Sequence, residues 1–483
     1  MRPRSAEPRF VTGSPLRHVV VMSGTGAIGL ISVFAVDLAN LFYISLLGQA
    51  SVAAAVGFAG VIIFFQVSIC IGLTIGVSAS VSRMIGTGQR GAARRVASAS
   101  LCMMAALALV VGLATVLLLD PFLSRLGAAG ETFRLAKMYL TLTSPTLPLL
   151  AVGMGCAALM RSVGDARRAM NVTLSAAIAT AMLDPLLIFG LHLSLMGAAI
   201  ASIGSRLLLA GVGWYGAARV NHLLGRVAWR TLPADLRPVL GVALPAVLTN
   251  LATPVGSAYT THTMAVFGAA AVAGQATIDR ISPVAFGIIY ALTGAVGPIL
   301  AQNLGAGRPD RVRQTLRASL LFVLASVLAA WLLLALAQGL IVRAFSAHGL
   351  AEIEVRLFCN WLAGSFVFAG CLFVANSVFN NLGFPLLSTT FNWGRATLGT
   401  IPFVYFGARF GPQGILIGQA LGSVLFGLAA VAVAFRVVRL APEDGASAQP
   451  GAPPGIPAES GRGALAASLV TSVTTFIRGG PKR

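Results

Sequence analysis

Twelve apolar segments, each long enough to cross a bilayer as a helix, constrain the fold of this chain more than any other feature. About 20 apolar residues are needed for one crossing. Of the 483 residues, 57% are hydrophobic and only 10% are charged, which excludes ordinary soluble, disordered and collagen-like chains. We therefore expect an all-α integral membrane protein with twelve transmembrane helices. The segments fall near residues 18–43, 52–82, 96–119, 138–160, 169–190, 197–218, 239–266, 271–301, 318–342, 357–380, 386–408 and 414–435.

The net charge of +20 comes from basic residues that lie mainly between the apolar segments. With the N-terminus placed inside, the inner segments hold 25 of the 34 Lys and Arg residues and the outer loops hold six. Positive charge next to a span favours the cytoplasmic side. We predict a multi-pass protein of the cell inner membrane with both termini cytoplasmic. The charge is topogenic in this interpretation, so no nucleic-acid partner is expected, and the basic N-terminus is not a cleaved signal peptide.

The chain contains an internal duplication. The stretch "RMIGTGQRGAARR" at 83–95 resembles "QNLGAGRPDRVRQ" at 302–314, and Gly164 aligns with Gly383 at the same offset of 219 residues. Two copies of six spans cross in the same sense, so the lobes should be related by a pseudo-two-fold axis along the membrane normal, with a substrate site between them. The predicted parts are a cytoplasmic segment 1–17, a lobe 18–218, a cytoplasmic loop 219–238, a lobe 239–435 and a disordered cytoplasmic tail 436–483.

Three of the fourteen carboxylates lie inside apolar segments, where each costs roughly 2.5–3.5 kcal/mol on insertion scales. Asp37 shares a helix face with Asn40, and Asp184 shares one with Thr180 and precedes Pro185. A buried carboxylate with such neighbours can exchange H⁺ or bind Na⁺. The alternative is a structural acid, hydrogen-bonded to a neighbour or paired with Arg206.

Asp279, His262 and Asn376 are weaker candidates. Asp279 precedes Arg280 and can lie near the outer interface, while His262 and Asn376 can equally serve helix packing. The glycines at 86 and 88, and at 305 and 307, favour tight turns rather than a phosphate-binding loop. The sequence has no catalytic motif, no metal-ligand cluster and no cofactor signature, so we do not expect an enzyme or a cofactor.

Together these motifs resemble the multidrug and toxic compound extrusion (MATE) family. "VDLANLFYISLLGQASVAAAVG" is similar to its first-helix signature, and "RMIGTGQRGAARR" and "GPILAQNLGAGRPDRVR" to its paired inner-loop motifs. "RSVGDARRAM" and "LDPLLIFG…GAAIAS" are similar to its fourth- to sixth-helix pattern. The resemblance covers roughly residues 20–435 and implies two six-helix lobes and H⁺- or Na⁺-coupled export by alternating access. It places the family's aspartates at Asp184 and at position 40, where this chain has Asn40 with Asp37 one turn earlier. Thr180 stands where the family often has Asn.

The sequence therefore predicts a cation-coupled antiporter that exports amphipathic, often cationic, drugs or metabolites. The expected coupling site is Asp37, Asn40, Thr180 and Asp184, and two lobes in one chain allow a monomer to function. Its partners are a small-molecule substrate, H⁺ or Na⁺, and the lipid bilayer. The nearest alternative is a lipid-linked precursor flippase of the same superfamily, for which Arg206, Arg280 and Arg395 should face a central cavity. A polytopic membrane enzyme is a third and weaker alternative.

Overall fold

The computed structural model describes residues 8–46 and 50–439. Of the predicted disordered tail 436–483, residues 436–439 are instead the last turn of a helix, and 440–483 lie outside the described residues. The first half contains α1 (Pro15–Leu46), α2 (Ala50–Gly86), α3 (Arg90–Leu117), the short α4 (Leu119–Arg125), α5 (Gly130–Thr143), α6 (Leu147–Ser162), α7 (Ala166–Pro185) and α8 (Ser194–Trp214). The second half contains α9 (Leu232–Ala265), α10 (Ala269–Ala285), α11 (Gly287–Gly305), α12 (Pro309–Ala344), α13 (Leu350–Asn360), α14 (Phe366–Leu382), α15 (Pro385–Ala396), α16 (Ile401–Gly407) and α17 (Gly411–Arg439). No strand occurs in the described ranges.

The helices confirm the twelve predicted crossings. Eleven stretches are long and apolar enough to span a membrane within residues 8–46 and 50–439. The last, Pro385–Arg439, holds two crossings, because α15 and α16 run one way and α17 returns after a turn at Gly411. α5 and α6 are joined by one 3-10 turn and form one span, as do α10 and α11, and α13 precedes the span of α14.

The duplication sets the register of the helices. α2 and α10 begin at residues 50 and 269, and α3 and α12 begin at residues 90 and 309, so both pairs keep the 219-residue offset. The turn glycines follow the same rule: Gly88 and Gly307 both have positive φ, as do Gly164 and Gly383. Glycine adopts this conformation without the steric penalty of a Cβ. The predicted tight turns are thus confirmed, and they lie at one end of the bundle, which we call the basic end because its connections carry most of the arginines.

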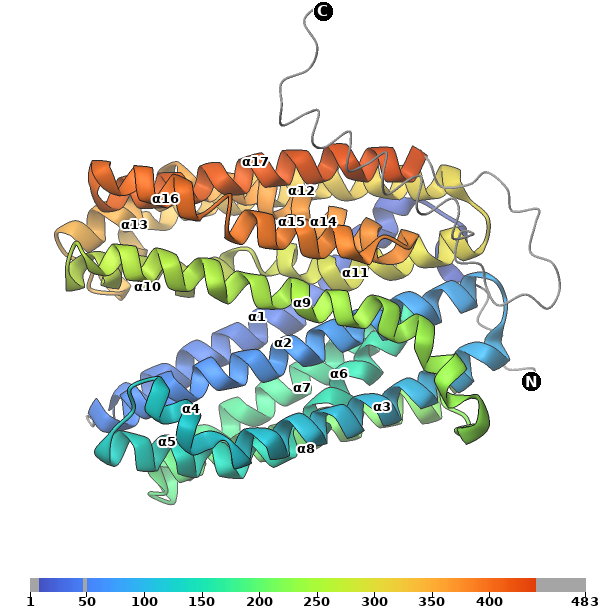
Figure 1. Cartoon of the computed structure of the whole chain (residues 1–483), viewed down its shortest axis with the longest axis horizontal. Helices are drawn as coiled ribbons and strands as arrows, with labels where there is room; N and C mark the ends of the chain where they lie inside the picture. The colour runs from blue at the N-terminus through green and yellow to red at the C-terminus, as the bar shows by residue number, and fades with distance from the viewer. Residues whose placement is uncertain (1–7, 47–49, 440–483) are drawn as a thin grey trace, which may run out of the picture. The chain divides into compact units, whose positions relative to one another are not determined.

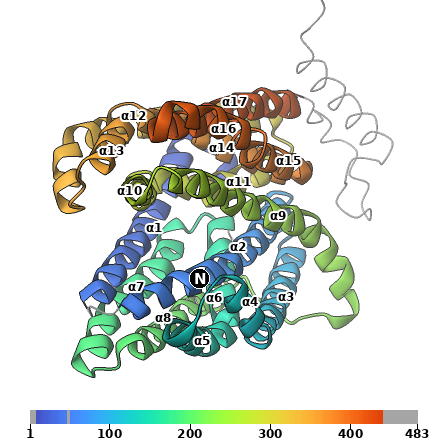
Figure 2. The same ribbon diagram turned by 60° about the vertical axis from the view of Figure 1, so that its left-hand side comes forward.

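The two halves of residues 8–439 lie side by side, with α1 and α2 packed against α11 and α9 (Figures 1 and 2). Small residues bring these helices together toward the basic end. A Cβ on Gly76 would lie 2.6 Å from the Val239 carbonyl oxygen, and Gly86 and Gly305 each press on the other lobe's helix end. The lobes therefore make backbone-to-backbone contact at the basic end.

A short N-terminal segment reinforces this closure. The buried Arg311 donates from Nη2 to the carbonyl oxygens of Phe10 (2.9 Å) and Gly13 (3.0 Å). The Phe10 N–H donates to Gln302 Oε1, and Arg9 Nη1 donates to the Gly164 carbonyl oxygen. Residues of both halves thus bind the segment 9–13. Hydrogen bonds through this segment therefore connect the two halves at the basic end, in addition to the direct helix contacts.

Candidate functional site

Asp184 lies at the end of α7, where the regular helix stops. Pro185 cannot donate a backbone hydrogen bond, and the chain continues as a π-helical turn over Leu186–Gly190. π-helical turns inside helices occur frequently at functional sites. The Asp184 side chain is only 1% exposed, and neither carboxyl oxygen has a hydrogen-bond partner within the described residues. A buried charge without a partner is costly, so this carboxyl group needs a proton or a bound cation.

Asp37 lies on α1, which packs along α7. Its carboxylate interacts electrostatically with that of Asp184, so the structure brings the two predicted acids into one neighbourhood. Asp37 is exposed at the surface of the helix bundle, whereas Asp184 is enclosed.

The two polar neighbours named from the sequence have different surroundings. Asn40 Oδ1 is buried and has no hydrogen-bond donor among the described residues. Thr180 Oγ1 donates to the Ala176 carbonyl oxygen at 3.1 Å, which leaves its oxygen lone pairs available. Both residues therefore keep oxygen lone pairs available. No group of three or more His, Cys, Asp or Glu side chains gathers in the described part of the chain.

Tyr139 is a member of this neighbourhood that the sequence analysis missed. Its hydroxyl interacts electrostatically with Asp37, Asp184 and Arg206, and lies 3.2 Å from Ser202 Oγ. The only sequence signal was a tyrosine at the start of the predicted fourth span. Arg206 does not pair with the acids: it donates to the Thr143 carbonyl oxygen and to Thr146 Oγ1. The structural alternative of an Asp184–Arg206 ion pair is therefore not what the structure contains.

The weaker candidates lie elsewhere. His262 is exposed in the last turn of α9. Asn376 accepts a hydrogen bond from Asn392 Nδ2 at 3.0 Å, which joins α14 to α15. Asp279, on α10, is accessible to water and is hydrogen-bonded by Gln275. None of the three contacts the neighbourhood of Asp37 and Asp184 in the described contacts.

The helix arginines differ in what surrounds them. Arg280 lines an apolar groove of about 350 Å³ with residues of α12. Arg395, on α15, interacts electrostatically with Tyr290 of α11. Arg161, which the sequence analysis assigned to an inner loop, lies in the last turn of α6, and its side chain reaches Gly294 of α11. Of the three predicted cavity arginines, only Arg395 therefore turns toward α11, and Arg161 joins it there.

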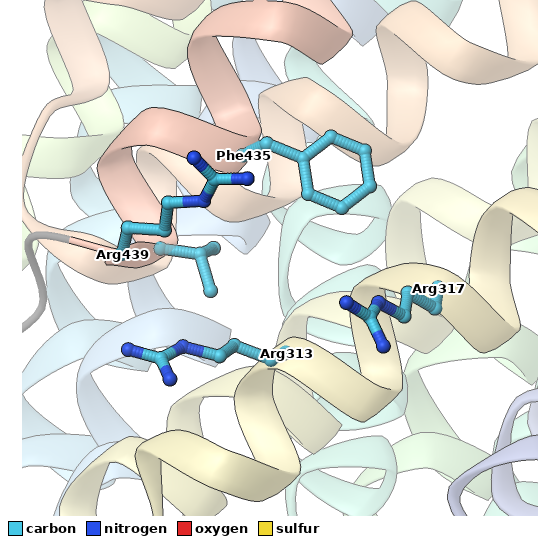
Figure 3. Close-up of a pocket in the computed structure, with 5 residues that line it drawn as sticks. Arg313, Arg317, Phe435 and Arg439 are labelled. Atoms are coloured by element: carbon cyan, nitrogen blue, oxygen red, sulfur yellow. The ribbon is translucent and has the colours of Figure 1, made fainter.

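A separate basic pocket of about 310 Å³ lies between the start of α12 and the end of α17. Figure 3 shows the side chains of Arg313, Arg317 and Arg439 gathered there beside Phe435. The pocket lies at the basic end, whereas Asp37 and Asp184 lie toward the far ends of α1 and α7. It is therefore not part of the acid neighbourhood.

Comparison with known proteins agrees with this fold. The MatE family model matches residues 27–186 and 245–406, one block in each half. A protein of Shewanella oneidensis named "FAD transporter" is 29% identical over 88% of this chain and 95% of its own length. The "Multidrug export protein MepA" of Staphylococcus haemolyticus is 25% identical over 58% of this chain and 62% of its own length. A solved structure of a mutant of the Vibrio cholerae MATE transporter VcmN has a TM-score of 0.83 at 25% identity, covering 88% of this chain and 97% of that one.

Proposed function

Because the chain belongs to the MatE family, it is a membrane transporter rather than an enzyme, and we propose that it is a cation-coupled antiporter. In this proposal it exports small amphipathic molecules across the cell inner membrane by alternating access. Both termini are cytoplasmic, which puts the basic end on the cytoplasmic side and follows from the excess of Lys and Arg there.

The observation that carries the proposal is the buried Asp184 carboxyl group without a hydrogen-bond partner among the described residues, beside the accessible Asp37. A carboxyl group in this setting is stable only when neutralised, so it takes up H⁺ or Na⁺. Asn40 Oδ1 and the Thr180 hydroxyl complete the oxygen set for either ion. Release of the ion on the cytoplasmic side then resets the carrier.

The energy available from coupling is sufficient for export. Moving one elementary charge through 100 mV yields about 2.3 kcal/mol, which corresponds to an approximately fifty-fold concentration ratio. In this proposal, the state with Gly76, Gly86 and Gly305 against the opposite lobe is the one that is closed at the basic end. Opening the basic end must separate these contacts and release the Arg311 contacts with Phe10 and Gly13.

The experiment is gradient-driven transport in proteoliposomes that contain the full chain. We expect an imposed H⁺ or Na⁺ gradient to drive uphill movement of a probe such as ethidium, and Asp184→Asn to abolish it. Asp120→Asn is the matched control, because Asp120 is an exposed carboxylate paired with Lys137 in α5. If neither ion gradient drives any probe, the antiporter proposal is wrong.

One observation supports a second candidate, a lipid-linked precursor flippase. Arg395 and Arg161 both turn toward α11, as a cavity for a diphosphate group would require. The same vesicles distinguish the two functions: a flippase moves a fluorescent lipid-linked diphosphate between leaflets, whereas an antiporter moves the soluble probe.

A further inference from the structure

One face of α11 has a glycine where Arg161 packs against the helix. Tyr290 and Gly294 are four residues apart and therefore lie on the same side of the helix. A Cβ on Gly294 would lie 3.3 Å from Arg161 Nε and 3.6 Å from Arg161 Cζ. The guanidinium group of Arg161 therefore rests on the backbone of α11, where the lack of a side chain leaves it room.

The second half of the chain brings another cation to this face. Arg395 of α15 interacts electrostatically with the Tyr290 hydroxyl. Arg395 is ten residues from the start of α15, and Gly294 is eleven residues from the end of α11. Both therefore lie roughly 15 Å from the basic end at 1.5 Å per residue, near the middle of a bilayer.

Neither guanidinium group is neutralised by the protein. Within the described residues Arg161 and Arg395 form no ion pair and donate no side-chain hydrogen bond, whereas Arg206 and Arg311 both donate to neighbouring oxygens. Both arginine residues are half-buried. An arginine inside a membrane-spanning bundle is expensive, so two without an ion pair among the described residues indicate a ligand that supplies the counter-charge.

Aromatic rings complete the site. The Tyr290 ring lies 6.1 Å from that of Phe34 on α1 and 5.6 Å from that of Phe373 on α14. Rings at these separations offer both faces and edges to a flat aromatic group. Phe34 and Arg161 come from the first lobe and Phe373 and Arg395 from the second, so the site lies between the lobes.

We infer that the face of α11 around Tyr290 and Gly294 binds an aromatic, phosphate-bearing anion, with Arg161 and Arg395 as its phosphate contacts. Arginine suits this task because its planar fork donates two hydrogen bonds to one phosphate. The inference deepens the proposed function, since it names the substrate class of the antiporter. It adds an anionic class to the often cationic substrates expected from the sequence. Asp279 is the acidic group close to this face, since it too acts on Tyr290.

The test is equilibrium dialysis of the purified full-length protein with three probes: flavin adenine dinucleotide, riboflavin and ethidium. Riboflavin shares the flavin ring but has no phosphate, and ethidium is a cation. We expect the dinucleotide to bind about ten- to a hundredfold more tightly than riboflavin, the usual gain from charge-assisted hydrogen bonds. Arg161→Gln and Arg395→Gln should each remove about tenfold of that preference and leave riboflavin binding unchanged.

Two controls keep the test decisive. Arg280→Gln also removes an arginine from a helix, but in the groove beside α12, and should leave all three affinities unchanged. If a Gln variant fails to fold, Arg161→Lys and Arg395→Lys replace it, because they keep the positive charge. In addition, raised salt should weaken the binding of the dinucleotide to the native protein, because salt screens the attraction between the phosphates and the arginines. Equal binding of dinucleotide and riboflavin, or dinucleotide binding that is unaffected by both Gln variants, overturns the inference.

The binding test of the anion site and the transport test of the antiporter proposal can fail independently of each other. Ion-driven transport of ethidium without phosphate-dependent binding leaves the antiporter proposal standing and removes the anion site. Phosphate-dependent binding without any ion-driven transport leaves the anion site standing and removes the antiporter proposal.

Discussion

The two lobes share one helix plan but place their polar residues differently. On α1 and α7 the first lobe carries Asp37 and Asp184, whereas the 219-residue offset puts Gly256 and Phe403 at the equivalent places in the second lobe. A Cβ on Gly256 would lie 3.4 Å from Ala396 Cα, so α9 and α15 pack closely where α1 and α7 hold acids. Conversely, Tyr290 and Arg395 correspond to the apolar Ile71 and Ala176.

This difference separates the residues that build the helix bundle from the charged residues of the proposed sites. Turn glycines and apolar faces recur in both halves, because either half must cross the membrane and pack in the same way. The ionisable residues Asp37, Asp184 and Arg395 do not recur. The repeated plan therefore accounts for the fold, whereas the charges of Asp37, Asp184 and Arg395 belong to one lobe each.

The largest expected effect is the loss of transport when an acid of the first lobe is removed, compared with an acid of the second lobe. Asp37→Asn should abolish ion-driven accumulation, because the accessible member of the acid pair is lost, while Asp279→Asn in the second lobe should leave coupling intact. The native protein should reach an accumulation ratio on the order of fifty at 100 mV, and Asp37→Asn should reach none. Probe accumulation in proteoliposomes measures both. Equal losses in the two variants would mean that both lobes share the coupling task.

The next effect tests the close packing of the second lobe. A Cβ on Gly422 of α17 would overlap the carbonyl oxygen of Gly399, so Gly422→Ala should lower stability by about 1–3 kcal/mol. Gly211→Ala on α8 is the matched control, because nothing lies within 4 Å of the added methyl group there. Thermal unfolding of the purified variants measures both. A Gly422→Ala protein as stable as Gly211→Ala would show that the second lobe is not closed by this contact.

The arrangement of spans and turns was largely predictable from the sequence, whereas some polar residues of the proposed sites were not. Spans and turns depend on local properties: apolar length, and glycine where φ is positive. The acids were found because charge is rare inside an apolar segment. Arg161 was missed because an arginine at the end of a span has the same sequence pattern as topogenic charge, and only the length of its side chain brings it to Gly294. Arg311 was missed for the same reason, since its partners lie some 300 residues away.

A smaller effect concerns the first turn of α7. Asp165 accepts hydrogen bonds from Arg168 Nη1 (2.7 Å) and Asn221 Nδ2 (3.0 Å), and Phe384 at the equivalent position of the second lobe offers no such cap. Partial burial alone would raise the pKa of Asp165, but these hydrogen bonds lower it below its usual 3.8. The stabilisation is therefore present above pH 4 and is lost as the pH falls through the lowered pKa.

Asp165→Ala should thus cost about 1 kcal/mol at neutral pH and progressively less in acid. Melting temperatures of the native protein and the variant, measured from neutral pH to about pH 3, give the difference. Asp310→Ala is the control, because Asp310 is an exposed first-turn acid whose ion pair with Arg308 spans 3.6 Å. A gap between native and Asp165→Ala melting temperatures that stays constant with pH would contradict the capping role.

The smallest effect sharpens the comparison at α11. Asp279 and Arg395 act on Tyr290 with opposite signs, so Asp279→Asn should make the surrounding potential more positive. Flavin adenine dinucleotide should then bind about threefold more tightly and ethidium more weakly, as expected for one charge removed at moderate distance. The exposed Asp120→Asn should change neither affinity. Weaker dinucleotide binding in Asp279→Asn would mean that the carboxylate helps to hold the ligand, and the second lobe would then have to be treated as a cation-binding lobe like the first.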